Sequence, residues 1–230
     1  MKKKIFIACD TNNTDKAKKI IKSTKTNKID IGYKFGIEFF YSKYGRSFIS
    51  KLDRRIPIWI DLKLMDIPNT VGSAIVSLKD LRNIDYITVH VSGGLEMMRI
   101  AKKKAKQNNK KIKVLGVTVL TSFSQESIKK TGHTKSIKNI VKQQARLAMV
   151  AGLDGVVCSA HEVQLVRKIC KRKIIITPGI RLKGDEVQDQ MRVMTPQKAF
   201  DNKADAIVVG RSITQGNIKN NIQKLINSLK

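Results

Sequence analysis

The sequence predicts a single α/β domain, a (β/α)8 barrel of the TIM type, that spans residues 1–230. Eight short apolar runs rich in β-branched residues recur along the chain, and amphipathic stretches separate them. The runs are mostly continuous rather than alternating, as in parallel strands that are covered on both faces. Eight strand–helix units in 230 residues fit one barrel.

The expected strands and helices alternate from the N-terminus to the C-terminus. The strands are expected at residues 4–8, 29–33, 57–60, 86–89, 113–117, 155–158, 174–176 and 206–209. Helices expected between them include residues 15–23, 71–81, 94–107, 138–151, 160–171 and 217–229. An open doubly wound sheet is the alternative fold. It is less favoured because no Gly-x-Gly-x-x-Gly fingerprint follows the first strand.

Composition is that of an ordinary globular chain. Hydrophobic residues make up 41% and charged residues 28%. No apolar run reaches the roughly 18 residues that a membrane span needs. The basic N-terminus is followed by Asp10 too soon for a signal-peptide core. We therefore expect a cytoplasmic protein with no membrane partner.

The formal net charge of +28 suggests nucleic-acid binding as one hypothesis. The lysines are spread along the whole chain, however, and aromatic residues that could stack on bases make up only 5%. Frequent Lys, Asn and Ile suggest codon bias as an alternative source of the charge. We expect no nucleic-acid partner, although a positive field would attract an anionic small substrate.

The three cysteines, Cys9, Cys158 and Cys170, are too few and too scattered for a disulfide framework. Cys9 and Cys158 lie in apolar runs, which favours buried thiols that pack as small hydrophobic groups. No Cys/His spacing resembles a zinc site. Trp59 and the Met97-Met98 pair are likewise expected in the core.

The most informative stretch is Ile-Asp-Leu-Lys-Leu-Met-Asp-Ile-Pro-Asn-Thr at residues 60–70. Asp61, Lys63 and Asp66 place two carboxylates and one ammonium within six residues, where a strand is expected to end. Opposite charges crowded together are costly to desolvate, so the surroundings must keep them charged and aligned. Such groups are typical of functional sites.

Other polar residues follow the remaining expected strands. In a barrel of this type the active site lies at the carboxyl ends of the strands. The residues expected there are Asp10, Lys34, Asp61, Lys63, Asp66, His90, Thr121, Ser122, Arg181, Gly210 and Arg211. We expect them to converge on one mouth, with His90 as a hydrogen-bonded structural residue.

Two of these strand ends indicate an anion. Loops after the seventh and eighth strands commonly bind phosphate in such barrels. Here they carry Arg181 and the Gly210-Arg211 pair. Glycine lets a backbone N–H approach an anion, and arginine can hold phosphate with two parallel hydrogen bonds. The long polar loop at residues 178–195 is a candidate lid.

Several of these segments, in order along nearly the whole chain, resemble the motifs of the orotidine 5′-phosphate decarboxylase family. The stretch at residues 61–70 is similar to its signature. The other similar segments are residues 8–10, 33–36, 117–122, 152–160, 177–181, 189–196 and 209–214. One departure is Met65, where the family often has His; another is Asp-Gln-Met-Arg at residues 189–192.

The resemblance implies a homodimer that converts orotidine 5′-monophosphate to UMP and CO₂ with no metal and no organic cofactor. It makes Lys63 the proton donor of a charged array, with Asp66 and Thr70 contributed across the dimer interface. It also places Lys34 and Asp61 in the array, with Asp61 beside the substrate. It implies that Asp10 and Lys34 contact the ribose. Thr121 and Gln190 would hold the base and phosphate ends, and the phosphate would be bound by Arg181, Gly210 and Arg211.

Two other function classes are compatible with parts of the sequence. A related metal-dependent enzyme acting on a keto-sugar phosphate shares the Asp-x-Lys-x-x-Asp pattern, but it needs an acidic Mg²⁺ ligand near the end of the second strand. Lys34 stands there instead. A basic nucleic-acid-binding protein accounts for the charge but gives no reason for carboxylates at strand ends.

Overall fold

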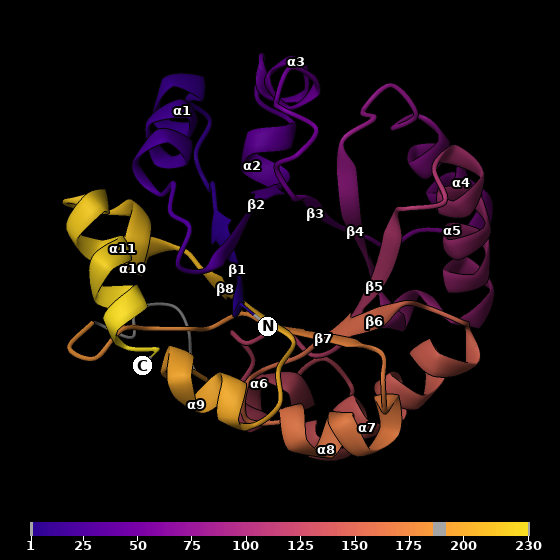
Figure 1. Ribbon diagram of the computed structural model, residues 1–230. Helices are drawn as coiled ribbons and strands as arrows, with labels where there is room; N and C mark the ends of the chain where they lie inside the picture. The colour runs from indigo at the N-terminus through magenta and orange to yellow at the C-terminus, as the bar shows by residue number, and fades with distance from the viewer. Residues whose placement is uncertain (1, 186–191, 230) are drawn as a thin grey trace.

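The computed structural model describes residues 2–185 and 192–229. Strands β1 to β8 form a closed parallel barrel in sequence order, and helices surround it (Figure 1). β1 pairs with both β2 and β8, which closes the sheet. The predicted (β/α)8 barrel is confirmed, and the open doubly wound alternative is wrong.

The elements follow one another as strand and helix around the barrel. The strands are β1 (Lys4–Ala8), β2 (Asp30–Gly36), β3 (Ile58–Leu64), β4 (Ile84–His90), β5 (Lys113–Val117), β6 (Gly155–Val157), β7 (Ile174–Thr177) and β8 (Ala206–Val209). The larger helices are α1 (Thr14–Ser23), α4 (Pro68–Val76), α5 (Leu95–Asn108), α7 (Ile137–Val150), α8 (Val163–Cys170) and α11 (Ile218–Asn227). Shorter helices are α2 (Ile37–Phe40), α3 (Gly45–Ser50), η1 (Val91–Gly93), α6 (Gln125–Lys129), α9 (Pro196–Asp201) and α10 (Arg211–Thr214).

Some predicted boundaries of strands and helices were wrong, and the boundary of β3 matters for the site. β3 continues to Leu64, so Asp61 and Lys63 lie within the strand rather than beyond it. α4 begins at Pro68, three residues before the predicted start, because the fixed φ of proline suits the first helical position.

The barrel has two apolar layers. Side chains that point inward form a small cluster, while the larger cluster fills the space between sheet and helices. Inside the barrel, Phe6 packs edge-on against Trp59 and Tyr86, with ring centroids 5.3 and 5.4 Å apart. These three rings form an aromatic plug in the barrel. A Cβ on Gly32 would lie 2.5 Å from the Phe6 ring, so glycine at this position leaves room for the plug.

The aromatic plug determines where polar groups can lie. Side chains alternate across a strand, so the residues two positions after Trp59 and Tyr86 also face the barrel interior. These residues are Asp61 and Thr88, and both are buried. The aromatic plug therefore fills the barrel interior with apolar side chains directly below these polar residues.

The predicted core residues are confirmed. Trp59, Met97 and Met98 are at most 1% exposed, and Cys9, Cys158 and Cys170 are buried free thiols. Burial raises the pKa values of the Cys9 and Cys158 thiols far above the usual value for cysteine. None of the described helices is both long enough and apolar enough to cross a membrane.

Candidate active site

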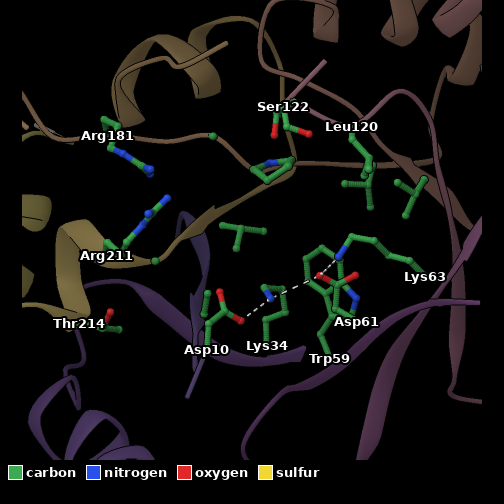
Figure 2. A pocket seen from close by; sticks show the side chains of 18 of the residues that line it. Asp10, Lys34, Trp59, Asp61, Lys63, Leu120, Ser122, Arg181, Arg211 and Thr214 are labelled. Atoms are coloured by element: carbon green, nitrogen blue, oxygen red, sulfur yellow. Dashed lines mark hydrogen bonds and ion pairs between the residues drawn. The ribbon is translucent and has the colours of Figure 1, made fainter. Parts of the chain in front are cut away.

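A cavity of about 520 Å³ opens at the carboxyl ends of the strands, a size typical of small-molecule sites. Figure 2 shows its charged side chains gathered at two ends of the cavity. Among its lining residues are Asp10, Lys34, Asp61, Lys63, Thr121, Ser122, Arg181, Gly210 and Arg211. The predicted convergence is confirmed for these nine residues, whereas Asp66 and His90, which were expected at the same mouth, do not line the cavity.

One end of the cavity holds a chain of alternating charges, drawn as dashed lines in Figure 2. Lys34 Nζ donates to Asp10 Oδ1 at 3.0 Å and lies 3.4 Å from Asp61 Oδ2. Lys63 Nζ donates to the same Asp61 Oδ2 at 2.9 Å. Asp61 therefore bridges two ammonium groups.

The network keeps its members ionised although it is buried. Burial alone would lower the pKa of Lys34, but the carboxylates of Asp61 and Asp10 hold it above its usual value. Burial alone would raise the pKa of Asp61, but Lys34 and Lys63 hold it below its usual range. Each charge is stable because its neighbours have the opposite sign.

The backbone at Lys63 is unusual. Its φ of 50° lies in the left-handed region, which lysine rarely adopts. The register between β3 and β4 also shifts between Ile60 and Leu64, so β3 bulges there. Bulges re-aim side chains next to active sites. This one allows Asp61 and Lys63, two residues apart, to form an ion pair at the mouth.

Sequence reasoning missed Thr88, which contacts both residues of this ion pair. Thr88 Oγ1 donates to Asp61 Oδ1 at 2.8 Å and accepts from the Lys63 N–H at 3.0 Å. The sequence pattern that could have identified Thr88 is the alternation along β4, which directs Tyr86, Thr88 and His90 to one face of the strand. His90 is half-buried, and burial together with Lys63 lowers its pKa.

The other end of the cavity is basic. In Figure 2 the side chains of Arg181 and Arg211 extend toward each other and into the cavity, at the opposite end from Lys63. Arg181 is 9% exposed, and its Nη1 donates to its neighbour's carbonyl, Ile180 O, at 3.1 Å. A Cβ on Gly210 would meet only Ala8 within 4 Å, so the space above this glycine is open to the cavity.

The long loop between β7 and α9 is closed at its base. Arg181 N–H donates to Met194 O, and Met194 N–H donates to Gly179 O. Arg192 pairs with Glu162 and donates to Leu120 O, which ties the loop to the ends of β5 and β6. Gln190, predicted to contact substrate from this loop, lies outside the described residues.

Asp66 and Thr70 are described, and they do not line this cavity. Both are exposed, and Asp66 Oδ1 accepts from the N–H of Ile67 at 2.6 Å. The neighbouring apolar side chains are exposed as well, Met65 by 57% and Ile67 by 66%. The cavity of a single chain thus contains Lys34, Asp61 and Lys63 without the second signature carboxylate.

Several lining residues were not predicted from the sequence. They are Lys16, Trp59, Leu120, Thr214 and Gln215, with further apolar residues from the barrel wall. Lys16 adds a positive charge at the rim. Within residues 2–185 and 192–229, no group of three or more His, Cys, Asp or Glu side chains is placed to hold a metal ion.

Together, the closed barrel and the charged cavity at its mouth define an α/β-barrel enzyme with a small-molecule site. The family model described as orotidine 5′-phosphate decarboxylase / HUMPS matches residues 3–223. The chain belongs to this family, as its motifs suggested.

Individual relatives support the assignment over nearly the full length. Orotidine 5′-phosphate decarboxylase of Carboxydothermus hydrogenoformans is 40% identical over 218 residues, 93% of this chain and 90% of the relative. That of Wolbachia from Brugia malayi is 40% identical over 225 residues, 96% of each chain. The crystal structure of the Lactobacillus acidophilus enzyme superposes with a TM-score of 0.83 at 30% identity, covering 99% of both chains.

Proposed function

We propose that this chain decarboxylates orotidine 5′-monophosphate to UMP and CO₂, the last step of pyrimidine nucleotide synthesis. The observation that carries the proposal is the Asp10–Lys34–Asp61–Lys63 array at one end of a cavity that has two arginines at the other. The full-length relatives that bear this name support the same activity. They also favour it over the metal-dependent sugar-phosphate enzyme that shares the Asp-x-Lys-x-x-Asp pattern.

Loss of CO₂ from a pyrimidine carbon leaves negative charge where no adjacent group can delocalise it. A protein without a cofactor must stabilise that charge electrostatically. The Lys63 ammonium, held charged and oriented by Asp61, is placed to do this. It then delivers its proton to the carbon as general acid.

Asp61 has a second role in this proposal. It is buried, with its carboxylate ionised at the centre of the array. The leaving carboxylate of the substrate lies beside it, and two like charges in one site raise the energy of the bound substrate. Departure of neutral CO₂ relieves that repulsion.

The remaining residues bind parts of the substrate that are remote from the reacting carbon. Asp10 and Lys34 bind the ribose hydroxyls, and Arg181, Gly210 and Arg211 bind the phosphate. Thr121 and Gln190 contact the base and phosphate ends. Binding energy from this remote phosphate aligns the carbon with Lys63. The predicted lid at residues 178–195 falls partly outside the described residues, which leave out residues 186–191.

We further propose that the active protein is a homodimer in which Asp66 and Thr70 complete the partner's site. The exposed Met65 and Ile67 beside Asp66 support this, because adjacent exposed apolar side chains are typical of interfaces. A matched pair of inactive variants tests it. Lys63→Ala and Asp66→Asn, each inactive alone, should regain activity when they are unfolded and refolded together.

The activity that the refolded mixture should regain can be calculated. Random mixing of equal amounts makes half of the dimers mixed, and each mixed dimer has one intact site. About one quarter of wild-type activity per subunit is therefore expected. No recovery, while size-exclusion chromatography shows dimers, would mean that each site takes Asp66 and Lys63 from the same chain, and would refute the shared-site arrangement.

The proposed reaction needs neither metal nor organic cofactor, and this separates it from the metal-dependent alternative. The test is a spectrophotometric assay with orotidine 5′-monophosphate, with and without EDTA. We expect UMP formation at the same rate in both. Turnover that EDTA abolishes would favour the metal-dependent reading, and absence of turnover would refute the proposal. The cytoplasmic location and the absence of nucleic-acid or membrane partners stay predictions.

A further inference from the structure

Thr88 occupies a buried position between the two charged residues of β3. Its side chain projects from the middle of β4 into the barrel interior, and the residue is 1% exposed. A hydroxyl has one proton to donate and lone pairs to accept. Thr88 Oγ1 donates its proton to Asp61 Oδ1 and accepts the Lys63 N–H, so both capacities are used.

This single hydroxyl stands opposite the bulge in β3. Ile60 pairs with Ile87 and Leu64 pairs with Val89, so three residues of β3 face one residue of β4, Thr88. The Lys63 N–H cannot take part in a regular ladder there and bonds to the Thr88 hydroxyl instead. A left-handed backbone at lysine persists only where its surroundings fix it.

The same hydroxyl fixes which oxygen of Asp61 faces the lysines. Asp61 Oδ1 is occupied by Thr88, while Oδ2 lies 2.9 Å from Lys63 Nζ and 3.4 Å from Lys34 Nζ. Rotation of the carboxylate would break the bond to Thr88. The orientation of Asp61 and the backbone of Lys63 are thus coupled through one atom.

We propose that Thr88 is the positioning residue of the active site, whose hydroxyl holds the Asp61 carboxylate and the Lys63 backbone in the geometry that aims the ammonium at the reacting carbon. The assignment rests on the proposed decarboxylation. It does not make Thr88 a catalytic residue, because the hydroxyl acts through Asp61 and Lys63.

The test compares Thr88→Val, which removes the hydroxyl at nearly constant volume, with Thr88→Ser, which keeps it. Because a hydrogen bond to a charged group is lost, kcat should fall roughly 10- to 100-fold in the valine variant. KM should change little, since the phosphate contacts at the other end of the cavity remain. The serine variant should retain most of the wild-type kcat.

A pH profile separates positioning from a structural role. The Thr88 hydrogen bond favours ionised Asp61, so its removal raises the pKa of that carboxyl. The acid limb of kcat should therefore move to higher pH in Thr88→Val and stay in place in Thr88→Ser. A general loss of packing would lower the fraction of folded enzyme without moving this limb.

Thr24→Val is the matched control. Thr24 is fully buried, and its hydroxyl contacts Tyr33 Oη at 2.7 Å and Ile20 O at 2.8 Å, away from the cavity. This variant should lower the melting temperature and leave kcat and the pH profile unchanged. If Thr88→Val does not fold, Thr88→Ala, which cannot clash, takes its place beside Thr88→Ser.

Two results would overturn the assignment of Thr88. One is a folded Thr88→Val or Thr88→Ala enzyme with wild-type kcat and an unmoved acid limb. The other is a serine variant as impaired as the valine variant. Both results require a wild-type protein that turns over orotidine 5′-monophosphate. An inactive wild-type protein would instead refute the proposed function itself.

Discussion

The two ends of the cavity are built in different ways. Lys34 and Asp61 lie in paired parts of β2 and β3 above the aromatic plug, while the backbone of Lys63, in the bulge of β3, is held by the Thr88 hydroxyl. Arg181 follows β7 in a long loop, and Arg211 begins the four-residue helix α10. The strand-borne end suits groups that must be aimed at one atom, while the loop end suits contacts that only bind the ligand.

This difference makes separate predictions for the two ends, and the largest effect is expected at Lys63. Lys63→Ala should lower kcat by at least the roughly 10²–10³ typical of one electrostatic group, because the ammonium supplies both the charge and the proton. Steady-state assays with orotidine 5′-monophosphate measure it, and circular dichroism checks that the fold is intact. Lys104→Ala, on helix α5, is the control and should behave as wild type.

Near-normal turnover by a folded Lys63→Ala variant would remove the proposed mechanism. An intermediate result is informative as well. If kcat falls but added primary amines restore part of it, the ammonium rather than the side-chain packing is what the site requires.

The second prediction concerns the loop end. Arg211→Ala should lower kcat/KM by roughly 10- to 100-fold, since a charge-assisted contact to phosphate is lost. Orotidine, which lacks the phosphate, provides the sharper measurement. Its slow turnover should be the same in the variant and the wild type, because Arg211 has no phosphate to bind there. A variant that slows both substrates equally would place Arg211 with the reacting groups and break the comparison.

The sequence predicted which residues meet at the cavity better than it predicted how they contact one another. Strand order, together with the rule that carboxyl ends meet at one mouth, was enough to bring Lys34, Asp61 and Arg181 together. The β3 bulge was not predictable, because a register shift depends on how Thr88 and Lys63 meet across two strands. Period-two patterns assign faces but not cross-strand contacts.

Asp66 illustrates another limit of sequence reasoning. Its spacing from Lys63 suggested a shared site, yet within one chain it points to the surface, and its proposed role needs a second copy. Sequence spacing predicts which side chains share a face only as far as the strand extends. β3 ends at Leu64, so the residues beyond it follow the turn into α4 instead of the barrel interior.

The smallest predicted effect is a pH dependence of stability that belongs to the strand-borne end alone. The folded-state pKa of Asp61 lies below its usual value, so its ionised form stabilises the fold above pH ~4, and this contribution is lost as the pH falls. Asp61→Asn cannot ionise. The difference in unfolding free energy between wild type and Asp61→Asn should therefore shift against the wild type on acidification, by about 1.4 kcal/mol for each unit of pKa depression.

Urea unfolding at pH 7 and at about pH 3 measures that shift, and Arg211→Ala is the control from the loop end. Arg211 keeps its charge over this range, so the difference between wild type and Arg211→Ala should stay nearly constant. An Asp61→Asn difference that is equally constant would mean that the carboxyl is not stabilised by Lys34 and Lys63 in the folded state. The network of Lys34, Asp61 and Lys63 would then differ from the arginine end only in position. There would be no physical basis for assigning catalysis to the network and phosphate binding to the arginines.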